Sequence, residues 1–266
     1  MTTALSLELE KQAVAASAIR VSGLRKRYGE IIAVNGISFE VGENEVFGLL
    51  GPNGAGKTTT VEILEGLREA DDGEAVVAGV DVRRHPSRVK SLIGVQLQAS
   101  EFLDHLTLVE LLDMLGALYG RRVDAHSLLE KVDLADKAKS YVRKLSGGQK
   151  QRFSIAAALV NDPRVLFLDE PSTGLDPQAR RHLWELIEEL HKERRSIVLT
   201  THYMEEAERL CDRVAIMDHG RIIALDRPAA LVQQLLAKGF KKERAEAEAN
   251  LEDVFIDLTG HELRED

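Results

Sequence analysis

The chain has 266 residues, of which 44% are hydrophobic, and carries a formal net charge of −9. This composition is that of a globular protein with room for one large α/β domain and a subdomain. The acidic balance lacks the basic footprint of bulk nucleic-acid binding, so we expect no nucleic-acid partner. A lone Cys211 and the lack of an apolar run near the roughly 20 residues that span a bilayer favour a cytoplasmic protein with a peripheral membrane role at most.

The first part of the chain predicts a tail followed by a small β layer. Residues 1–17 read as a frayed tail or a short helix. Apolar residues at strand spacing from Ile19 to Val41 predict paired strands, with turns at residues 28–30 and 35–36. A turn at residues 71–73 then leads into another expected strand over residues 74–80.

Residues 51–58 read GPNGAGKT, a phosphate loop of the pattern G-x-x-x-x-G-K-[ST]. The apolar run before it predicts a buried strand and the residues after it have helical spacing, which is the context this loop requires. Its glycines let the backbone bend around an anion with the N–H groups pointing inward. We expect Lys57 to reach the β- and γ-phosphates of a nucleoside triphosphate and Thr58 to offer its hydroxyl to Mg²⁺. Alone, the loop fits kinases, GTPases and many ATPases.

The remaining segments predict a helical insert and a return to an α/β pattern. Leucines on helical stripes from about residue 106 to residue 134 indicate the insert. Strands are expected over residues 165–168, 196–200 and 213–217, with an amphipathic helix between the first two. Past Asp226 the chain becomes charged and alanine-rich, and a last amphipathic segment over residues 251–258 has Asn250 placed as its N-cap.

Two acids end the expected strand over residues 165–168, at the sheet edge where ligands of open α/β folds bind. We expect Asp169 to bind Mg²⁺, directly or through water, and Glu170 to polarise the attacking water as a general base. Upstream, Ser146 precedes two glycines at the start of an alanine-rich helical run. These residues fit a second anion site or an ordinary capped helix, and on their own they leave both interpretations open.

Five segments in order decide the family: GPNGAGKT, LSGGQKQR from Leu145, VLFLDEP from Val165, STGLDP from Ser172 and TTH ending at His202. Over about residues 19–226 this set resembles the ATP-binding subunits of ABC transporters. The resemblance implies an α/β P-loop NTPase (RecA-like) core with an antiparallel β layer and an inserted α-helical subdomain. The expected domains are a tail at 1–17, an ATPase domain at 18–227 whose helical subdomain spans about 100–160, and a C-terminal helical extension at 228–266.

The resemblance also implies a role for each matching position. Gln98 matches the glutamine that contacts Mg²⁺ and the attacking water, with Gln96 as a rival two residues earlier. The implied catalytic set is Glu170, His202 at the γ-phosphate, and Gln98, and the implied Mg²⁺ set is Thr58, Gln98 and Asp169. The implied ATP-binding set is Tyr28, stacked on adenine, with Gly51, Pro52, Asn53, Gly54, Ala55, Gly56, Lys57, Thr58 and Thr59.

The same resemblance implies partners. A second ATP-binding subunit, in a homodimer, is expected to present its signature segment in trans, and Asp176 is expected to line that interface. The signature residues are Leu145, Ser146, Gly147, Gly148 and Gln149. Residues 251–260 are similar to the tail of exporter ATPases whose permease is a separate membrane chain, which implies a position on the cytoplasmic face of the cell membrane.

Three other functions of ABC-type ATPases make different demands on the sequence. A soluble ABC ATPase that energises an assembly scaffold fits the same motifs. DNA-repair ATPases of the coiled-coil kind need a long insertion between the phosphate loop and the signature, which this chain lacks. A regulator that binds nucleotide without hydrolysis predicts a damaged Glu170 or His202, and neither residue is replaced.

Overall fold

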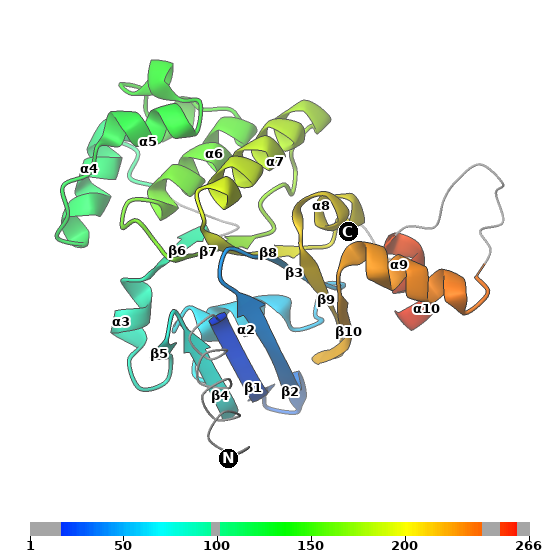
Figure 1. Cartoon of the computed structure of the whole chain (residues 1–266). Coiled ribbons are helices and arrows are strands. Elements are labelled where there is room, and N and C mark those ends of the chain that lie inside the picture. The colour runs from blue at the N-terminus through cyan, green and yellow to red at the C-terminus, as the bar shows by residue number, and fades with distance from the viewer. Residues whose placement is uncertain (1–16, 97–101, 241–250, 260–266) are drawn as a thin grey trace, which may run out of the picture.

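The computed structural model describes residues 17–96, 102–240 and 251–259 (Figure 1). Two sheets lie next to each other, and helices cover the outer face of the larger one. Figure 1 shows α6 (Gly147–Ala158) and α7 (Pro177–Lys192) above the larger sheet and the smaller sheet below it. The P-loop NTPase core with an antiparallel β layer and a helical insert, predicted from the sequence, is therefore confirmed.

The smaller sheet is antiparallel and has the strand order β2-β1-β4-β5. Its inward side chains, among them Ile19 and Val21, join one hydrophobic core with the inner face of the larger sheet. Its strands are β1 (Ser17–Tyr28), β2 (Ile31–Gly42), β4 (Asp72–Val77) and β5 (Val80–Asp81).

The predicted turn at Asn35–Gly36 is wrong, because β2 runs through both residues. Gly36 has a φ of 73°, and the pairing of β1 with β2 shifts register nearby. A bulge of this kind uses the same Asn-Gly pair that would otherwise make a hairpin turn. The expected strand over residues 74–80 is instead a hairpin, since Ala78 and Gly79 both have positive φ, as a two-residue turn requires.

The larger sheet has the strand order β10-β9-β3-β8-β7-β6, and only β10 runs antiparallel to its neighbour. Every residue of β3 and β7 is buried, which is why these strands are continuous apolar runs rather than alternating ones. Its strands are β3 (Val46–Leu50), β6 (Ile93–Gln96), β7 (Val165–Asp169), β8 (Ser196–Thr201), β9 (Arg213–Asp218) and β10 (Arg221–Asp226).

The predicted helical insert forms above β6 and β7 (Figure 1). Thr107 starts its first helix through a capping box with Glu110, and the buried leucines of that helix face the main core. Besides α6, the insert contains α4 (Leu108–Leu118), α5 (Ala125–Lys131) and the short 3₁₀ helices Ala135–Lys137 and Val142–Lys144.

The remaining helices connect the strands and close the C-terminal side. The C-terminal α10 packs on α9 and on α8, with Leu251 and Phe255 fully buried; its expected N-cap, Asn250, lies outside the described residues. No helix in the described ranges is long and apolar enough to cross a bilayer. These helices are α2 (Lys57–Leu64), α3 (Pro86–Lys90), α8 (Met204–Leu210), α9 (Pro228–Ala237) and α10 (Leu251–Thr259).

Candidate active site

The phosphate loop joins β3 to α2, as the sequence predicts. Gly56 stands at the N-cap of α2 with a φ of 101°, and a Cβ at this position would lie 2.2 Å from the carbonyl oxygen of Ala33. Only glycine therefore fits, and the first N–H groups of α2 remain available to an anion. Lys57 is buried, and its ammonium donates to the carbonyl oxygens of Gly51 at 2.7 Å and Pro52 at 3.2 Å.

Glu170 follows the carboxyl end of β7, and the side chains of Lys57 and His202 lie close to its carboxylate. Its Oε1 is 3.8 Å from Lys57 Nζ, and its Oε2 is 3.4 Å from His202 Nδ1. The backbone of Glu170 has a φ of 47°, a conformation that a non-glycine residue adopts only where its surroundings enforce it. The nearby His202, followed by Lys57, holds the pKa of the Glu170 carboxyl below its usual value despite partial burial. Glu170 is thus an ionised acceptor at neutral pH.

Asp169 is more deeply buried than Glu170, and burial raises the pKa of its carboxyl. The Thr200 hydroxyl donates to Asp169 Oδ1, while the Glu170 backbone N–H donates to Thr200 Oγ1 at 3.0 Å. Thr200 therefore fixes both acids. Thr200 belongs to the TTH motif, but the sequence predicts no role for it. Its pairing with Asp169 on the neighbouring parallel strand identifies its role.

The residues present fit a magnesium nucleotide. In the described ranges no group of three His, Cys, Asp or Glu side chains clusters as a metal site. Mg²⁺ does not need one, because it is usually held by one or two carboxylates together with substrate phosphates and water. Asp169 and the exposed Thr58 on α2 supply such a donor set. The third predicted ligand, Gln98, lies outside the described residues, and its rival Gln96 is buried at the end of β6.

The sequence matches the ABC transporter family over residues 34–173. The chain belongs to the ABC transporter family. A Nod factor export ATP-binding protein I from Ralstonia nicotianae is 38% identical over 93% of this chain and 95% of its own length. Daunorubicin resistance ATP-binding protein DrrA2 from Streptomyces coeruleorubidus is 46% identical over 80% of this chain and 68% of its own length.

Solved structures agree with this assignment. An ATP-binding subunit of an ABC transporter has a TM-score of 0.78 and 28% identity, and the match covers 91% of this chain and all of that one. A dimeric bacterial ABC transporter cassette has a TM-score of 0.71 and 25% identity over 79% of this chain and 98% of its own. The protein is accordingly an ATP-binding subunit that hydrolyses ATP to energise transport.

The ABC signature segment begins helix α6. Ser146 caps the helix through a capping box with Gln149, so the interpretation as a capped helix is confirmed. Ser146 and Gly147 remain exposed, whereas Leu145 is buried. A Cβ on Gly148 would lie 2.9 Å from the Cβ of Ala179, so the signature packs closely against the start of α7.

Asp176 and Tyr28 both occupy exposed positions. Asp176 caps α7 by accepting the N–H groups of Gln178 and Ala179, a structural role that the sequence reading did not include. Tyr28 ends β1, is 38% exposed, and has the Arg68 guanidinium 5.4 Å from its ring. Both residues are therefore accessible from outside the chain.

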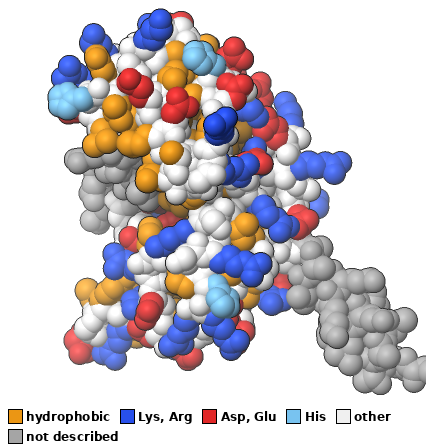
Figure 2. Space-filling model, turned by 90° about the vertical axis from the view of Figure 1, so that its left-hand side faces the viewer, with side chains coloured by type: hydrophobic (Ala, Val, Ile, Leu, Met, Phe, Trp, Pro, Cys, Tyr) orange, Lys and Arg blue, Asp and Glu red, His pale blue; other side chains and the backbone are white. Residues whose placement is uncertain are grey.

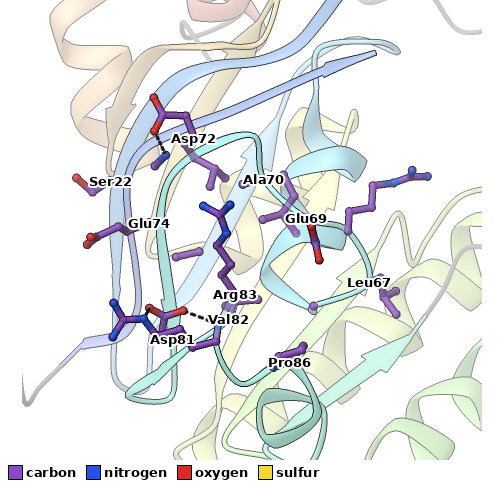
Figure 3. Close-up of a pocket in the computed structure, with 17 residues that line it drawn as sticks. Ser22, Leu67, Glu69, Ala70, Asp72, Glu74, Asp81, Val82, Arg83 and Pro86 are labelled. Carbon is purple, nitrogen blue, oxygen red and sulfur yellow. Dashed lines mark hydrogen bonds and ion pairs between the residues drawn. The ribbon is translucent and has the colours of Figure 1, made fainter. Parts of the chain in front are cut away.

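A pocket of about 620 Å³ lies elsewhere, between the antiparallel sheet and the end of α2 (Figure 3). Figure 3 shows Arg83 at its centre with Glu74, Asp72 and Glu69 around it. Neither the phosphate loop nor Glu170 lines this pocket. Because its charges are of both signs and surround an exposed opening, it offers no specific site for the anionic nucleotide of an ABC ATPase.

Proposed function

We propose that this chain is the ATPase subunit of an exporter whose membrane-spanning permease is a separate chain. The observation that carries the proposal is the convergence of Lys57 and His202 on the Glu170 carboxylate, at 3.8 and 3.4 Å, beside a phosphate loop. The exporter assignment is supported by relatives named for Nod factor export and daunorubicin resistance. No relative among these is named for an assembly scaffold, so export is favoured over that alternative.

In this proposal each side chain of the site has a distinct task. The phosphate loop from Gly51 to Thr59 binds the triphosphate, and Lys57 leaves its loop carbonyls to meet the β- and γ-phosphates. Glu170, ionised because its pKa is lowered, accepts the proton of the attacking water. His202 donates toward the γ-phosphate. Asp169, Thr58 and Gln98 would hold Mg²⁺, which would supply positive charge next to the phosphates.

A second copy of this chain completes the site. The exposed start of α6 at Ser146 would approach the γ-phosphate bound by the partner's phosphate loop, since a helix N-terminus favours an anion. Asp176 would line the same interface. The likeness to a solved dimeric cassette supports this arrangement.

The permease is proposed to dock at a groove between the helical insert and the sheets, which we call the seam groove. This pocket of about 470 Å³ is lined mainly by apolar side chains, among them Phe102, Leu111 and Met114. Leu103 and Tyr119 at the groove are exposed, and Figure 2 shows hydrophobic side chains gathered on this face. An apolar surface of this kind marks a protein-binding site.

The same face also supports a position against the cytoplasmic side of the membrane. Below the hydrophobic patch, Figure 2 shows many Lys and Arg side chains. Arg84, Arg88 and Lys90 are exposed in and before α3, and Lys90 also lines the seam groove. Such charges favour the anionic leaflet that faces the cytoplasm.

Two measurements test the proposal. Lys57→Ala should abolish tight binding of ATP in a titration with a fluorescent analogue, because the cation that meets the phosphates is lost. Unchanged affinity would remove the phosphate loop from the mechanism.

Purification from native membranes should bring a polytopic permease with the chain, whereas association only with soluble scaffold proteins would favour the alternative function.

A further inference from the structure

Behind the active site, Glu206 places a carboxyl group inside the protein. Glu206 belongs to α8 and is fully buried, and burial raises the pKa of its carboxyl. A buried carboxyl is costly unless it has hydrogen-bond or charge partners. Its surroundings therefore have to be accounted for.

The partners of Glu206 come from three separate segments of the chain. The Trp184 indole on α7 donates to Glu206 Oε1 at 2.9 Å. The hydroxyls of Thr201 and Ser172 and the Arg180 guanidinium lie near enough to favour the charged form of the carboxyl and so limit the rise of its pKa. One side chain thus connects the end of β8, the segment after Glu170 and helix α7.

This cluster is not fully hydrogen-bonded. Within the described residues, Glu206 Oε2, Ser172 Oγ and Arg180 Nε are buried and lack a well-formed hydrogen bond. Leaving such atoms unpaired is unfavourable. The Glu206 carboxyl, the Ser172 hydroxyl and the Arg180 guanidinium therefore keep the capacity for further hydrogen bonds.

The cluster also reaches His202 through the neighbouring Tyr203. Thr201 Oγ1 accepts the Tyr203 backbone N–H at 2.9 Å, and the rings of Tyr203 and His202 are 4.2 Å apart. The Arg180 guanidinium carbon lies 4.6 Å from the centre of the Tyr203 ring. A shift of Arg180 toward Glu206 would therefore change how Tyr203 supports His202.

We propose that Glu206 is a positioning residue that acts through Arg180, Thr201 and Ser172. It keeps His202 in the correct position relative to Glu170 and to the segment leading to Asp176. This inference rests on the proposed roles of Glu170 and His202. Glu206 does not touch the reacting atoms, so its removal should disturb the geometry of hydrolysis and spare the binding of ATP.

The test compares Glu206→Gln with Glu205→Gln in the full chain. The first substitution keeps the size of the side chain and replaces the buried carboxyl group with an amide, whereas Glu205 is an exposed neighbour on the same helix. We expect Glu206→Gln to lower kcat for ATP by about 10- to 100-fold, because small displacements of catalytic groups cost that much. KM should stay within about twofold, as expected for a change in geometry alone. The Glu205→Gln control should match the wild type.

Trp184 supplies a second readout, because it is the single tryptophan of the chain and donates to Glu206. In a Glu170→Gln background, which we expect to retain ATP, adding ATP should change the Trp184 emission if the cluster rearranges with the site. The additional substitution Glu206→Gln should remove that change. A wild-type kcat for Glu206→Gln would overturn the proposal even if the emission differs.

Ser172→Ala keeps the proposal testable should Glu206→Gln fail to fold. It removes one hydroxyl of the cluster and leaves the carboxyl in place, and it should lower kcat at constant KM. A wild-type kcat in this variant would overturn the proposal. If the unmodified chain does not hydrolyse ATP, or if Glu170→Gln retains full turnover, the proposed function itself fails, which is a different outcome.

Discussion

Two carboxyl groups near the phosphate-loop helix, those of Glu170 and Glu65, have pKa values shifted in opposite directions. Glu170 has Lys57 and His202 beside it, and its pKa is lowered. Glu65, at the end of α2, is 2% exposed, and neither of its oxygens has a hydrogen-bond partner within the described residues. Burial, and then the nearby Asp169, raise the pKa of Glu65 to about 8.

The difference matches the two proposed roles, which are hydrolysis of ATP at Glu170 and docking of the permease at the seam groove. Partners decide the sign of the pKa shift, because desolvation acts in the same direction on both carboxyls. The charged acid, Glu170, follows β7 and lies beside Lys57 of the phosphate loop. The neutral acid lines the seam groove, where apolar side chains predominate.

After the loss of Glu170 itself, the largest effect should follow the loss of His202 beside it. His202→Ala should lower ATP turnover by about 10² to 10³, the range for losing one donor to a developing charge. ATP affinity should change little, since the phosphate loop remains. Steady-state turnover and nucleotide titration on one preparation measure both, and a fall in affinity without a fall in kcat would contradict the assignment.

Ser146→Arg tests whether the exposed signature completes the site of a second copy. The substitution adds a bulky side chain at the start of α6, where two subunits would meet. We expect ATP to bind the monomer normally but to fail to induce a dimer in sedimentation experiments in the Glu170→Gln background. Lys150→Arg, which retains the charge in the next turn, is the control. A normal ATP-induced dimer with Ser146→Arg would exclude the interface.

Glu65→Gln tests the neutral acid through the pH dependence of stability. The unfolded chain loses the Glu65 proton above the ordinary pKa of 4.5, whereas the folded chain keeps it until about pH 8. Within this window the folded state binds more protons than the unfolded state. The free energy of unfolding of the wild type therefore falls as pH rises, by at most about 1.4 kcal/mol per pH unit.

The amide introduced by Glu65→Gln has no proton to lose, so the variant should gain thermal stability over the wild type between pH 5 and 8, where the linkage acts. The exposed Glu69 provides the matched control, Glu69→Gln. Melting temperatures at several pH values measure the effect. Parallel curves for wild type and Glu65→Gln would show that Glu65 is not neutral in the folded chain.

The smallest expected effect concerns the permease. Leu103→Asp places a charge on the exposed apolar side chain in the seam groove and should weaken co-purification with the permease by about 10-fold or more, the value of burying one leucine. Leu236→Asp, at a similarly exposed leucine on α9, should have no effect. Equal losses from both variants would place the permease elsewhere.

The sequence predicts best those parts of the candidate site that depend on residues close together in the chain. A strand, a glycine pattern and a helix predict the phosphate loop. The apolar run before the two acids predicts that they lie at the end of a buried strand, β7. Both depend on interactions within a few residues. The structure confirms the fold they predict, including the helical insert and the parallel sheet.

The sequence does not predict which side chains from distant segments of the chain come into contact. The distance from His202 to Glu170 and the gathering of Ser172, Arg180 and Trp184 around Glu206 arise only when β7, α7 and α8 pack together. Glu206 reads as an ordinary polar residue of a short amphipathic helix. The Asn35–Gly36 turn failed for a related reason, because pairing with β1 accommodates this pair as a bulge.

Glu170 carries the mechanistic claim, so its substitution is the most direct test. Glu170→Gln keeps the shape of the side chain and removes the charge that Lys57 and His202 stabilise. The steady-state kcat for ATP should fall by about 10² to 10⁴, as expected for losing a general base, while ATP affinity measured on the same protein persists. Turnover within about twofold of the wild type, the resolution expected of such an assay, would contradict the claim.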